Sequence, residues 1–315
     1  VSGHGAPALK RFRGPLRVLG TGAALGLAVF VVWRAVDEFP RLDFSSPEVW
    51  YWLAKAIGLY MVSQIFGALA WREVLAAHGT ILPPGRAESQ LLLSQIGKYI
   101  PGNVAHLIGR YALGREDEIP GARIGSAVTM EVGLLLCIAA LVSSGLLLAP
   151  STFRAALVTA YGGATLMSAN LLLPVLLIVA LATVQAILWR RAGRPQIAVR
   201  HLFTAGLLHI ANFAVLGVSL WCVAGAVLPN SDVNLLTTTV IFSVAWALGF
   251  IVPGAPGGIG IRDGVIALGL GLVMGDGAAL AVAISHRVLS GLGDGAIFLF
   301  GLALRMTTKK PERSP

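Results

Sequence analysis

Six long runs of apolar residues divide the chain, and short polar segments separate them. Each run holds about 20 or more mostly apolar residues, the length that a helix needs to cross roughly 30 Å of hydrocarbon. The pattern therefore predicts an all-α polytopic membrane protein. Its spanning helices, about six in number, are expected at residues 16–36, 51–76, 124–149, 168–189, 202–228 and 278–304.

Two further apolar stretches, 89–114 and 236–275, do not fit as spans because a Pro-Gly pair interrupts each of them. The first half of the earlier stretch, from Ser89 to Ile100, has only 12 residues, which as a helix extend about 18 Å. We therefore expect two re-entrant helical hairpins, one entering the membrane from each side. Lipid cannot satisfy the open backbone of their loops, so the loops must face protein or a polar cavity.

Both interrupted stretches carry the pattern G-x-x-[IV]-P-G-x7-R. The first copy runs from Gly97 to Arg110 and the second from Gly249 to Arg262, an offset of 152 residues. Broken segments at corresponding places of two inverted halves indicate the central site of a transporter. In the simpler interpretation, the Pro-Gly pairs only break helices and bind nothing.

Basic residues indicate how the chain is oriented. Sixteen of the 24 lysines and arginines cluster at one face, which the positive-inside rule makes cytoplasmic. Both termini are then inside, in what we expect to be a bacterial or archaeal cytoplasmic membrane. The segment 151–167 is short, is interrupted by glycine and carries Arg154, so we interpret it as an amphipathic segment at the outer surface rather than a span. The predicted parts are a basic cytoplasmic N-terminus at 1–15, one transmembrane domain at 16–305 with inverted halves at about 51–189 and 202–305, and a cytoplasmic tail at 306–315.

Composition excludes several classes of protein. Charged residues make up 12% of the chain and apolar residues 56%, with a mean hydropathy of +0.78, whereas soluble domains carry about 25% charged residues. This excludes a disordered chain, a nucleic-acid-binding domain and an ordinary cytosolic enzyme, even with a net charge of +9. Cys137 and Cys222 lack metal-ligand spacing, and no nucleotide-binding or catalytic motif is present. We expect no metal, no cofactor and no catalytic residue.

Ionisable side chains within apolar runs are the candidates for function, because each costs about 2.5–3.5 kcal/mol at membrane depth. Arginine suits bidentate phosphate binding, and lysine acts as a point charge. The N-terminal NH groups of broken helices also bind anions. Glu131 would balance the cations or carry a proton. The predicted substrate-binding residues are Lys98, Pro101, Gly102, Asn103, Arg110, Glu131, Pro253, Gly254, Gly257, Gly258, Arg262 and Arg287.

A structural interpretation of the same charges stays open at this point. Buried ion pairs of Arg262 with Asp263, or of Glu131 with Arg287, would lock the two halves together. We interpret the remaining polar groups at this depth as structural partners or packing residues, namely Asp263, Asp294, His106 and His286.

Three segments, GKYIPGNVAHLIGR, VPGAPGGIGIRDG and SHRVLSGLGD, resemble the lysylphosphatidylglycerol synthase transmembrane-domain family, also described as the flippase-like domain family. The resemblance covers about residues 16 to 305 and implies an inverted-repeat helical fold with two re-entrant hairpins. It also implies lipid movement across the bilayer, of aminoacylated phosphatidylglycerol in full-length synthases and of glycolipid or polyprenyl-phosphate carriers in stand-alone relatives. Because the sequence ends at Pro315, we expect the stand-alone membrane part without the aminoacyltransferase domain. Glu131 is followed by Val132, where the family often has arginine.

Together these observations predict a lipid flippase rather than an enzyme. It would move a phosphate-bearing lipid, whether anionic, aminoacylated or linked to polyprenyl phosphate, between leaflets along a cation-lined path between the hairpins. The alternative is a membrane-embedded enzyme of lipid or glycan synthesis, or an obligate partner subunit of one; a non-catalytic scaffold is a third interpretation. The expected partners are the lipid itself and a lipid- or glycan-synthesising enzyme, without nucleic acid, and the sequence is compatible with an oligomer.

Overall fold

The computed structural model is helical, and the residues that it describes contain no strand. It describes residues 26–27, 29–33, 40, 43–100, 104–161, 176, 180, 183, 198–229, 231–252 and 255–308. The helices are α2 (Pro47–Ala77), α3 (Arg86–Ser94), η2 (Gln95–Tyr99), α4 (Ala105–Glu116), α5 (Gly121–Ser143), η3 (Ser144–Leu148), α6 (Ser151–Tyr161), α8 (Val199–Val227), α9 (Leu235–Ile251), η4 (Pro256–Gly258), α10 (Ile261–Met274) and α11 (Asp276–Thr307).

Four helical segments of the described chain are long and apolar enough to cross a membrane: α2, α5 continued by η3, α8 and α11. They coincide with four of the six predicted spans, and the all-α membrane fold is confirmed. The predicted spans 16–36 and 168–189 lie largely outside the described residues. Within the segment 151–167, α6 covers 11 residues and residues 162–167 are not described, so its placement at the outer surface stays a prediction.

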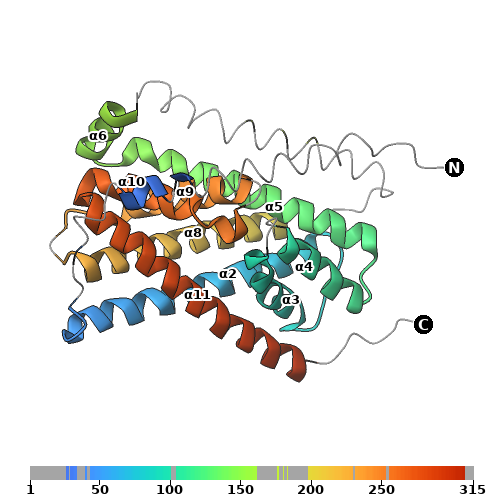
Figure 1. Cartoon of the computed structure of the whole chain (residues 1–315). Helices are drawn as coiled ribbons and strands as arrows, with labels where there is room; N and C mark the ends of the chain where they lie inside the picture. Colours follow the sequence, from blue (N-terminus) through green and yellow to red (C-terminus); the bar gives the residue numbers. More distant parts are fainter. Residues whose placement is uncertain are drawn as a thin grey trace.

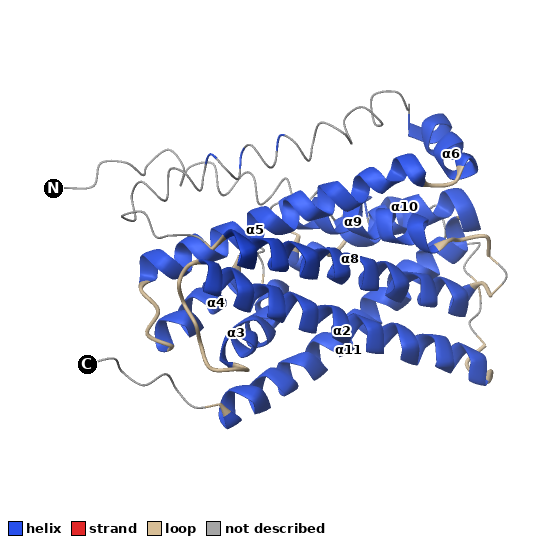
Figure 2. Cartoon of the chain, turned by 180° about the vertical axis from the view of Figure 1, so that it is seen from behind, coloured by secondary structure: helices blue, strands red, loops and turns tan. Residues whose placement is uncertain are grey.

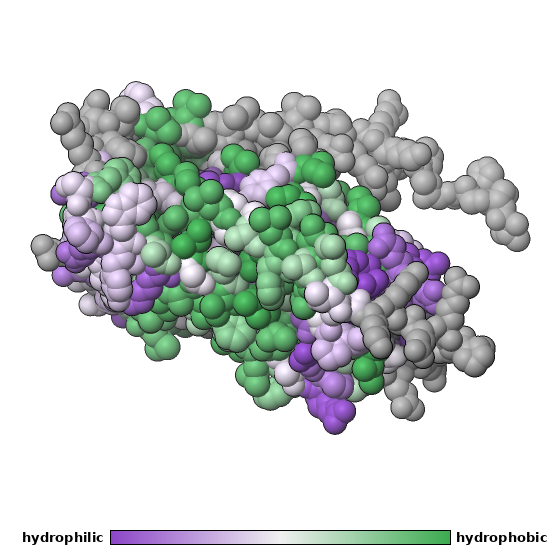
Figure 3. All heavy atoms as spheres, turned by 90° about the horizontal axis from the view of Figure 1, so that it is seen from below, coloured by the Kyte–Doolittle hydropathy of each residue, from purple (hydrophilic) through white to green (hydrophobic). Residues whose placement is uncertain are grey.

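The surface of the molecule is that of a protein surrounded by lipid. Seen from below, a broad apolar band lies between two polar ends (Figure 3). The long helices expose large apolar side chains, such as Ile65 on α2, Leu207 on α8 and Leu292 on α11. Contiguous apolar surface of this extent is costly in water but is the expected exterior of an integral membrane protein.

Helices α2 and α8 form the centre of the bundle and pack side by side in opposite directions (Figures 1 and 2). At one end, the NH of Ala198 donates to the carbonyl of Ala77 at 3.2 Å. At the other end, the rings of Trp52 and Trp221 meet edge to face at 5.5 Å. Between them, the Ser219 hydroxyl donates across the interface to a carbonyl of α2. The remaining helices are arranged around this pair.

Both Pro-Gly stretches form pairs of short helices, and the two pairs enter the bundle from opposite ends (Figure 1). The first pair consists of α3, η2 and α4, and the second of α9, η4 and α10; in each, the second helix packs back against the first. Their tips meet inside the bundle, where Gly257 lies against the backbone of Lys98. We call these elements the two broken pairs. That they are re-entrant hairpins in a bilayer stays a prediction.

Glycines at matching positions let each broken pair fold back on itself. A Cβ added to Gly97 would come within 2.8 Å of the backbone nitrogen of His106, and one added to Gly249 within 3.3 Å of the Cα of Gly258. In both copies of the motif, the first glycine touches the residue nine positions later. The repeated sequence pattern thus has a repeated structural cause: backbone approaches backbone at both glycines, too closely for a side chain at Gly97 and tightly at Gly249.

A buried carboxylate attaches the base of the first broken pair to the rest of the bundle. Asp117, just after α4, accepts hydrogen bonds from Arg86 at 2.7 Å, Gln90 at 2.6 Å and Arg305 at 3.2 Å. Gln90 in turn accepts from the indole NH of Trp71 at 3.0 Å. These bonds join α3 and α4 to the last turn of α11 and to α2.

Replacing Gly97 by alanine tests the close approach in the first broken pair. We expect Gly97→Ala to lower the free energy of unfolding by about 1–3 kcal/mol, because the backbone of α4 has to move aside. Thermal unfolding of the purified protein in detergent measures the effect. Gly125→Ala on α5 is the matched control, since an added Cβ there meets nothing within 4 Å. Equal unfolding temperatures for both variants would contradict the proposed packing.

Candidate functional site

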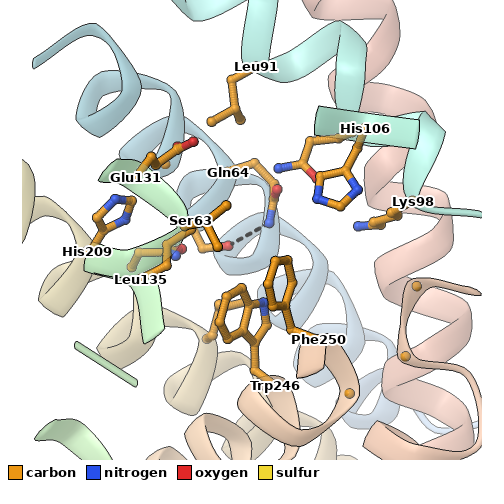
Figure 4. A pocket seen from close by; sticks show the side chains of 18 of the residues that line it. Ser63, Gln64, Leu91, Lys98, His106, Glu131, Leu135, His209, Trp246 and Phe250 are labelled. Atoms are coloured by element: carbon orange, nitrogen blue, oxygen red, sulfur yellow. Dashed lines mark hydrogen bonds between the residues drawn. The ribbon is translucent and has the colours of Figure 1, made fainter. Parts of the chain in front are cut away.

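A cavity of about 110 Å³ lies where the tips of the two broken pairs meet. It is large enough for several water molecules, since about 10–15 Å³ is enough for one. Both broken pairs line it, together with α2, α5 and α8 (Figure 4). The structure thereby brings together six of the residues predicted from sequence: Lys98, Arg110, Glu131, Gly257, Gly258 and Arg262.

Lys98 enters the cavity from the first broken pair and is held by a carboxylate of α11. Its ammonium lies 2.7 Å from Asp294, whose side chain is completely buried. The hydroxyls of Tyr60 and Tyr99 donate to the same carboxylate at 2.7 and 2.5 Å. Asp294, which the sequence interpretation made a structural partner, therefore ties η2 to α2 and α11. We call these four residues the Asp294 cluster.

Arg110 forms a second buried ion pair, with Glu131 of α5. The guanidinium also lies over the indole of Trp71, 4.9 Å from the ring centroid. Arg110 and Glu131 are 3% and 0% exposed, so neither charge could remain there without the other. The pairing of Glu131 with Arg287 that the sequence left open is wrong, because α5 faces α4 at this depth rather than α11.

Arg262, the counterpart of Arg110 in the second broken pair, is placed differently. Its guanidinium lies 6.0 Å from the ring centroid of Phe242, and its Nε has no hydrogen-bond partner. The pairing of Arg262 with Asp263 is also wrong, because Asp263 turns back to accept from the NH of Gly260 at 3.2 Å. Arg287 lies 4.0 Å from Asp263.

The tip of the second broken pair is fixed by two glycines in a left-handed conformation and by an arginine of α11. Gly257 and Gly258 adopt left-handed φ angles of 56° and 75°, and Arg287 donates to the carbonyl of Gly257 at 3.0 Å. Asp263 accepts from the NH of Gly260, the residue that precedes α10, so that one NH is not available to an anion. Five predicted site residues lie outside the described residues: Pro101, Gly102, Asn103, Pro253 and Gly254.

The charges around the cavity do not cancel. Counted formally over the described residues at the two tips and their partners, the cations exceed the carboxylates by one. The groups counted are Lys98, Arg110, Arg262 and Arg287 against Glu131, Asp263 and Asp294. An unbalanced cation inside a low-dielectric protein is costly unless an anion joins it.

Residues 18–295 match the family model of the lysylphosphatidylglycerol synthase TM region. The chain belongs to this family. No curated protein matches it significantly. The lysylphosphatidylglycerol synthase TM region is a multi-pass membrane domain linked to lipid handling, so membership supports membrane lipid as the class of partner for the cavity.

Several residues that line the cavity of this lysylphosphatidylglycerol synthase TM region have no motif that would have revealed them. His209 and Asn212 project from α8, and Trp246 from α9, into the same space as the predicted cations. His209 carried one usable signal, because an ionisable side chain in the middle of an apolar span is rare. Tyr60 and Asp294 are far apart in sequence, and only the fold brings them into contact.

Removing one partner of the Asp294 cluster tests its role. We expect Lys98→Met to lower the free energy of unfolding by about 3–5 kcal/mol, because it leaves a buried carboxylate without its cation. Adding Asp294→Asn should restore most of this loss, since asparagine carries no charge, accepts from one tyrosine through its oxygen and donates to the hydroxyl of the other through its amide.

Chemical unfolding in micelles measures the stability of Lys98→Met, of Asp294→Asn and of the double variant relative to the unchanged protein. Lys55→Met is the control, because Lys55 is an exposed lysine of α2 outside the cavity and should change stability little. Simple addition of the two single effects in the double variant would contradict the ion pair.

Proposed function

We propose that this protein is a lipid flippase that moves a phosphate-bearing lipid between membrane leaflets. The lipid would be anionic, aminoacylated or linked to polyprenyl phosphate, and its headgroup would pass along a cation-lined path between the two broken pairs. One observation carries the proposal: helices from opposite ends of the bundle deliver cations to the same cavity, and Arg262 there has an unbonded Nε and no ion pair with a described carboxylate.

The charge excess is what an anionic headgroup would satisfy. Arg110 and Lys98 already hold carboxylates, whereas Arg262 has an unbonded Nε and stands near the Gly257–Gly258 tip. A guanidinium binds phosphate through two parallel hydrogen bonds. We therefore assign the first contact with the phosphate to Arg262. Lys98 would make the second contact, with its ammonium group shared between Asp294 and the phosphate.

The arrangement also supports alternating access. A long helix, a broken pair and a second long helix occur twice along the chain, as α2 to α5 and α8 to α11. Together with the matched glycine contacts, this order supports an inverted repeat. Transporters built in this way keep the substrate site fixed and open it to one side at a time. We propose that the basic ends are cytoplasmic, that the tails stay in lipid throughout, and that the lipid is not altered chemically.

Leaflet redistribution in liposomes tests the proposal. We expect purified protein to accelerate movement of a phosphate-bearing lipid and Arg262→Gln to slow it about ten-fold or more, since charge-assisted hydrogen bonds contribute about 1.5–3 kcal/mol. Arg123→Gln should have no effect, because Arg123 is exposed and its guanidinium reaches only the carbonyl of Gly79.

Two outcomes would overturn the flippase. Chemically altered lipid in the liposomes would establish an enzyme. Movement that requires a second protein, with the purified chain folded but inactive alone, would establish a partner subunit of a lipid- or glycan-synthesising enzyme.

A further inference from the structure

The side of the cavity formed by α5 and α8 carries buried polar groups that nothing in the described structure satisfies. Both ring nitrogens of His209 and the Oδ1 of Asn212 lack hydrogen-bond partners, and so does the Oε1 of Glu131, whose Oε2 pairs with Arg110. His209 is 1% exposed and Glu131 0%. Figure 4 shows Glu131 and His209 on the opposite side of the cavity from Lys98. Buried polar groups are normally hydrogen-bonded to protein, water or a ligand, so these are the groups with which a ligand entering the cavity would bond.

A bare phosphate cannot satisfy them, because it mainly accepts hydrogen bonds. A carboxylate such as Glu131 and an amide oxygen such as that of Asn212 require donors. An uncharged imidazole requires one donor and one acceptor, and a charged His209 would only enlarge the cation excess. The ligand must therefore bring donors as well as a phosphate.

Two kinds of donor occur in lipid headgroups, ammonium and hydroxyl groups. An ammonium group would enter a cavity in which Lys98, Arg110 and Arg262 already exceed the carboxylates, and Glu131 is already paired with Arg110. Like charges at low dielectric repel strongly. Hydroxyl groups donate and accept without adding charge, so they match both the orphaned groups and the electrostatics.

An aromatic surface borders the same cavity. Trp246 and Phe250 stack with ring centroids 5.3 Å apart and an interplanar angle of 9°, and both line the cavity beside Gln64 (Figure 4). Phe213 packs against the edge of Trp246 and holds it in place. Aromatic side chains next to amide and imidazole groups fit the CH groups of a polyol or sugar ring, which is apolar on its face and polar at its rim.

We propose that the headgroup carried by this protein is a polyol or sugar phosphate, with its hydroxyls at His209, Asn212 and Glu131 and its phosphate at Arg262. This rests on the proposed function and narrows its substrate class. A site of this kind would make lipids with hydroxyl-rich headgroups better substrates than lipids with amine-bearing headgroups.

Binding of soluble headgroups tests the proposal without transport. The protein in nanodiscs of zwitterionic lipid is titrated calorimetrically with myo-inositol 1-phosphate, inorganic phosphate and phosphoethanolamine. We expect the inositol phosphate to bind about ten-fold more tightly than the other two, because two additional hydrogen bonds of about 0.5–1.5 kcal/mol each are made. Asn212→Leu and His209→Phe should remove this preference and leave phosphate affinity unchanged, whereas Arg262→Gln should weaken all three.

His201→Asn is the matched control, since His201 lies on the same helix but bonds to Glu73 away from the cavity. Two substitutions are used because either one alone could impair folding. Equal affinity for inositol phosphate and phosphate would overturn the hydroxyl site, and tightest binding of phosphoethanolamine would replace it by an ammonium site.

Leaflet assays separate this proposal from the flippase itself. Faster movement of phosphatidylinositol than of phosphatidylethanolamine supports both proposals. Equal movement of the two would leave the flippase standing and overturn the selectivity. Selective binding of inositol phosphate without movement of any lipid would leave the site standing and overturn the flippase.

Discussion

The structure depends on one constraint: a helix broken within an apolar bundle must find partners for its open backbone, because lipid offers none. Here η2 and η4, at the tips of the two broken pairs, lie against each other inside the bundle. The close approach of Gly97 to His106 and of Gly249 to Gly258 makes both tips compact enough to fit between α2, α5 and α8. A polar cavity at the centre is a consequence of this arrangement, because the space between the tips is lined by the polar groups that could not face lipid.

The same constraint explains why cations gather there. Lys98 lies at the tip of the first broken pair and Arg110 in the middle of α4, where their charges face the cavity, and each is matched by a carboxylate from a long helix. Arg262 departs from this rule, since the nearby Asp263 serves as a helix cap instead. A pattern in which all but one charge is balanced is typical of a binding site rather than of a structural core, where leftover charge only destabilises.

Much of this was accessible from the sequence, and the reasons for the rest are physical. Hydropathy and length predicted the four long helices that the structure describes, and the Pro-Gly repeat predicted the broken pairs, because both are local properties of the chain. The partners of the charges were not predictable, since the Lys98–Asp294 and Arg110–Glu131 pairs join residues 196 and 21 positions apart through packing alone. His209 and Trp246 were missed because a single polar or aromatic residue in a span looks the same whether it faces a cavity, a neighbour or lipid.

Helix α11 crosses the whole bundle obliquely (Figure 1) and has 32 residues, about 48 Å of helix against roughly 30 Å of hydrocarbon. The ion pairs that α11 makes in its middle and at its C-terminal end therefore lie in different surroundings. The bond of Asp294 to Lys98 lies deep in the bundle, where dissolved ions do not reach, whereas at the far end of α11 Arg305 meets both the buried Asp117 and the exposed Glu116. Ionic strength therefore weakens the contact of Arg305 with Glu116 and leaves the bonds of Asp117 and Asp294 in place, so the first broken pair stays attached at both its base and its tip.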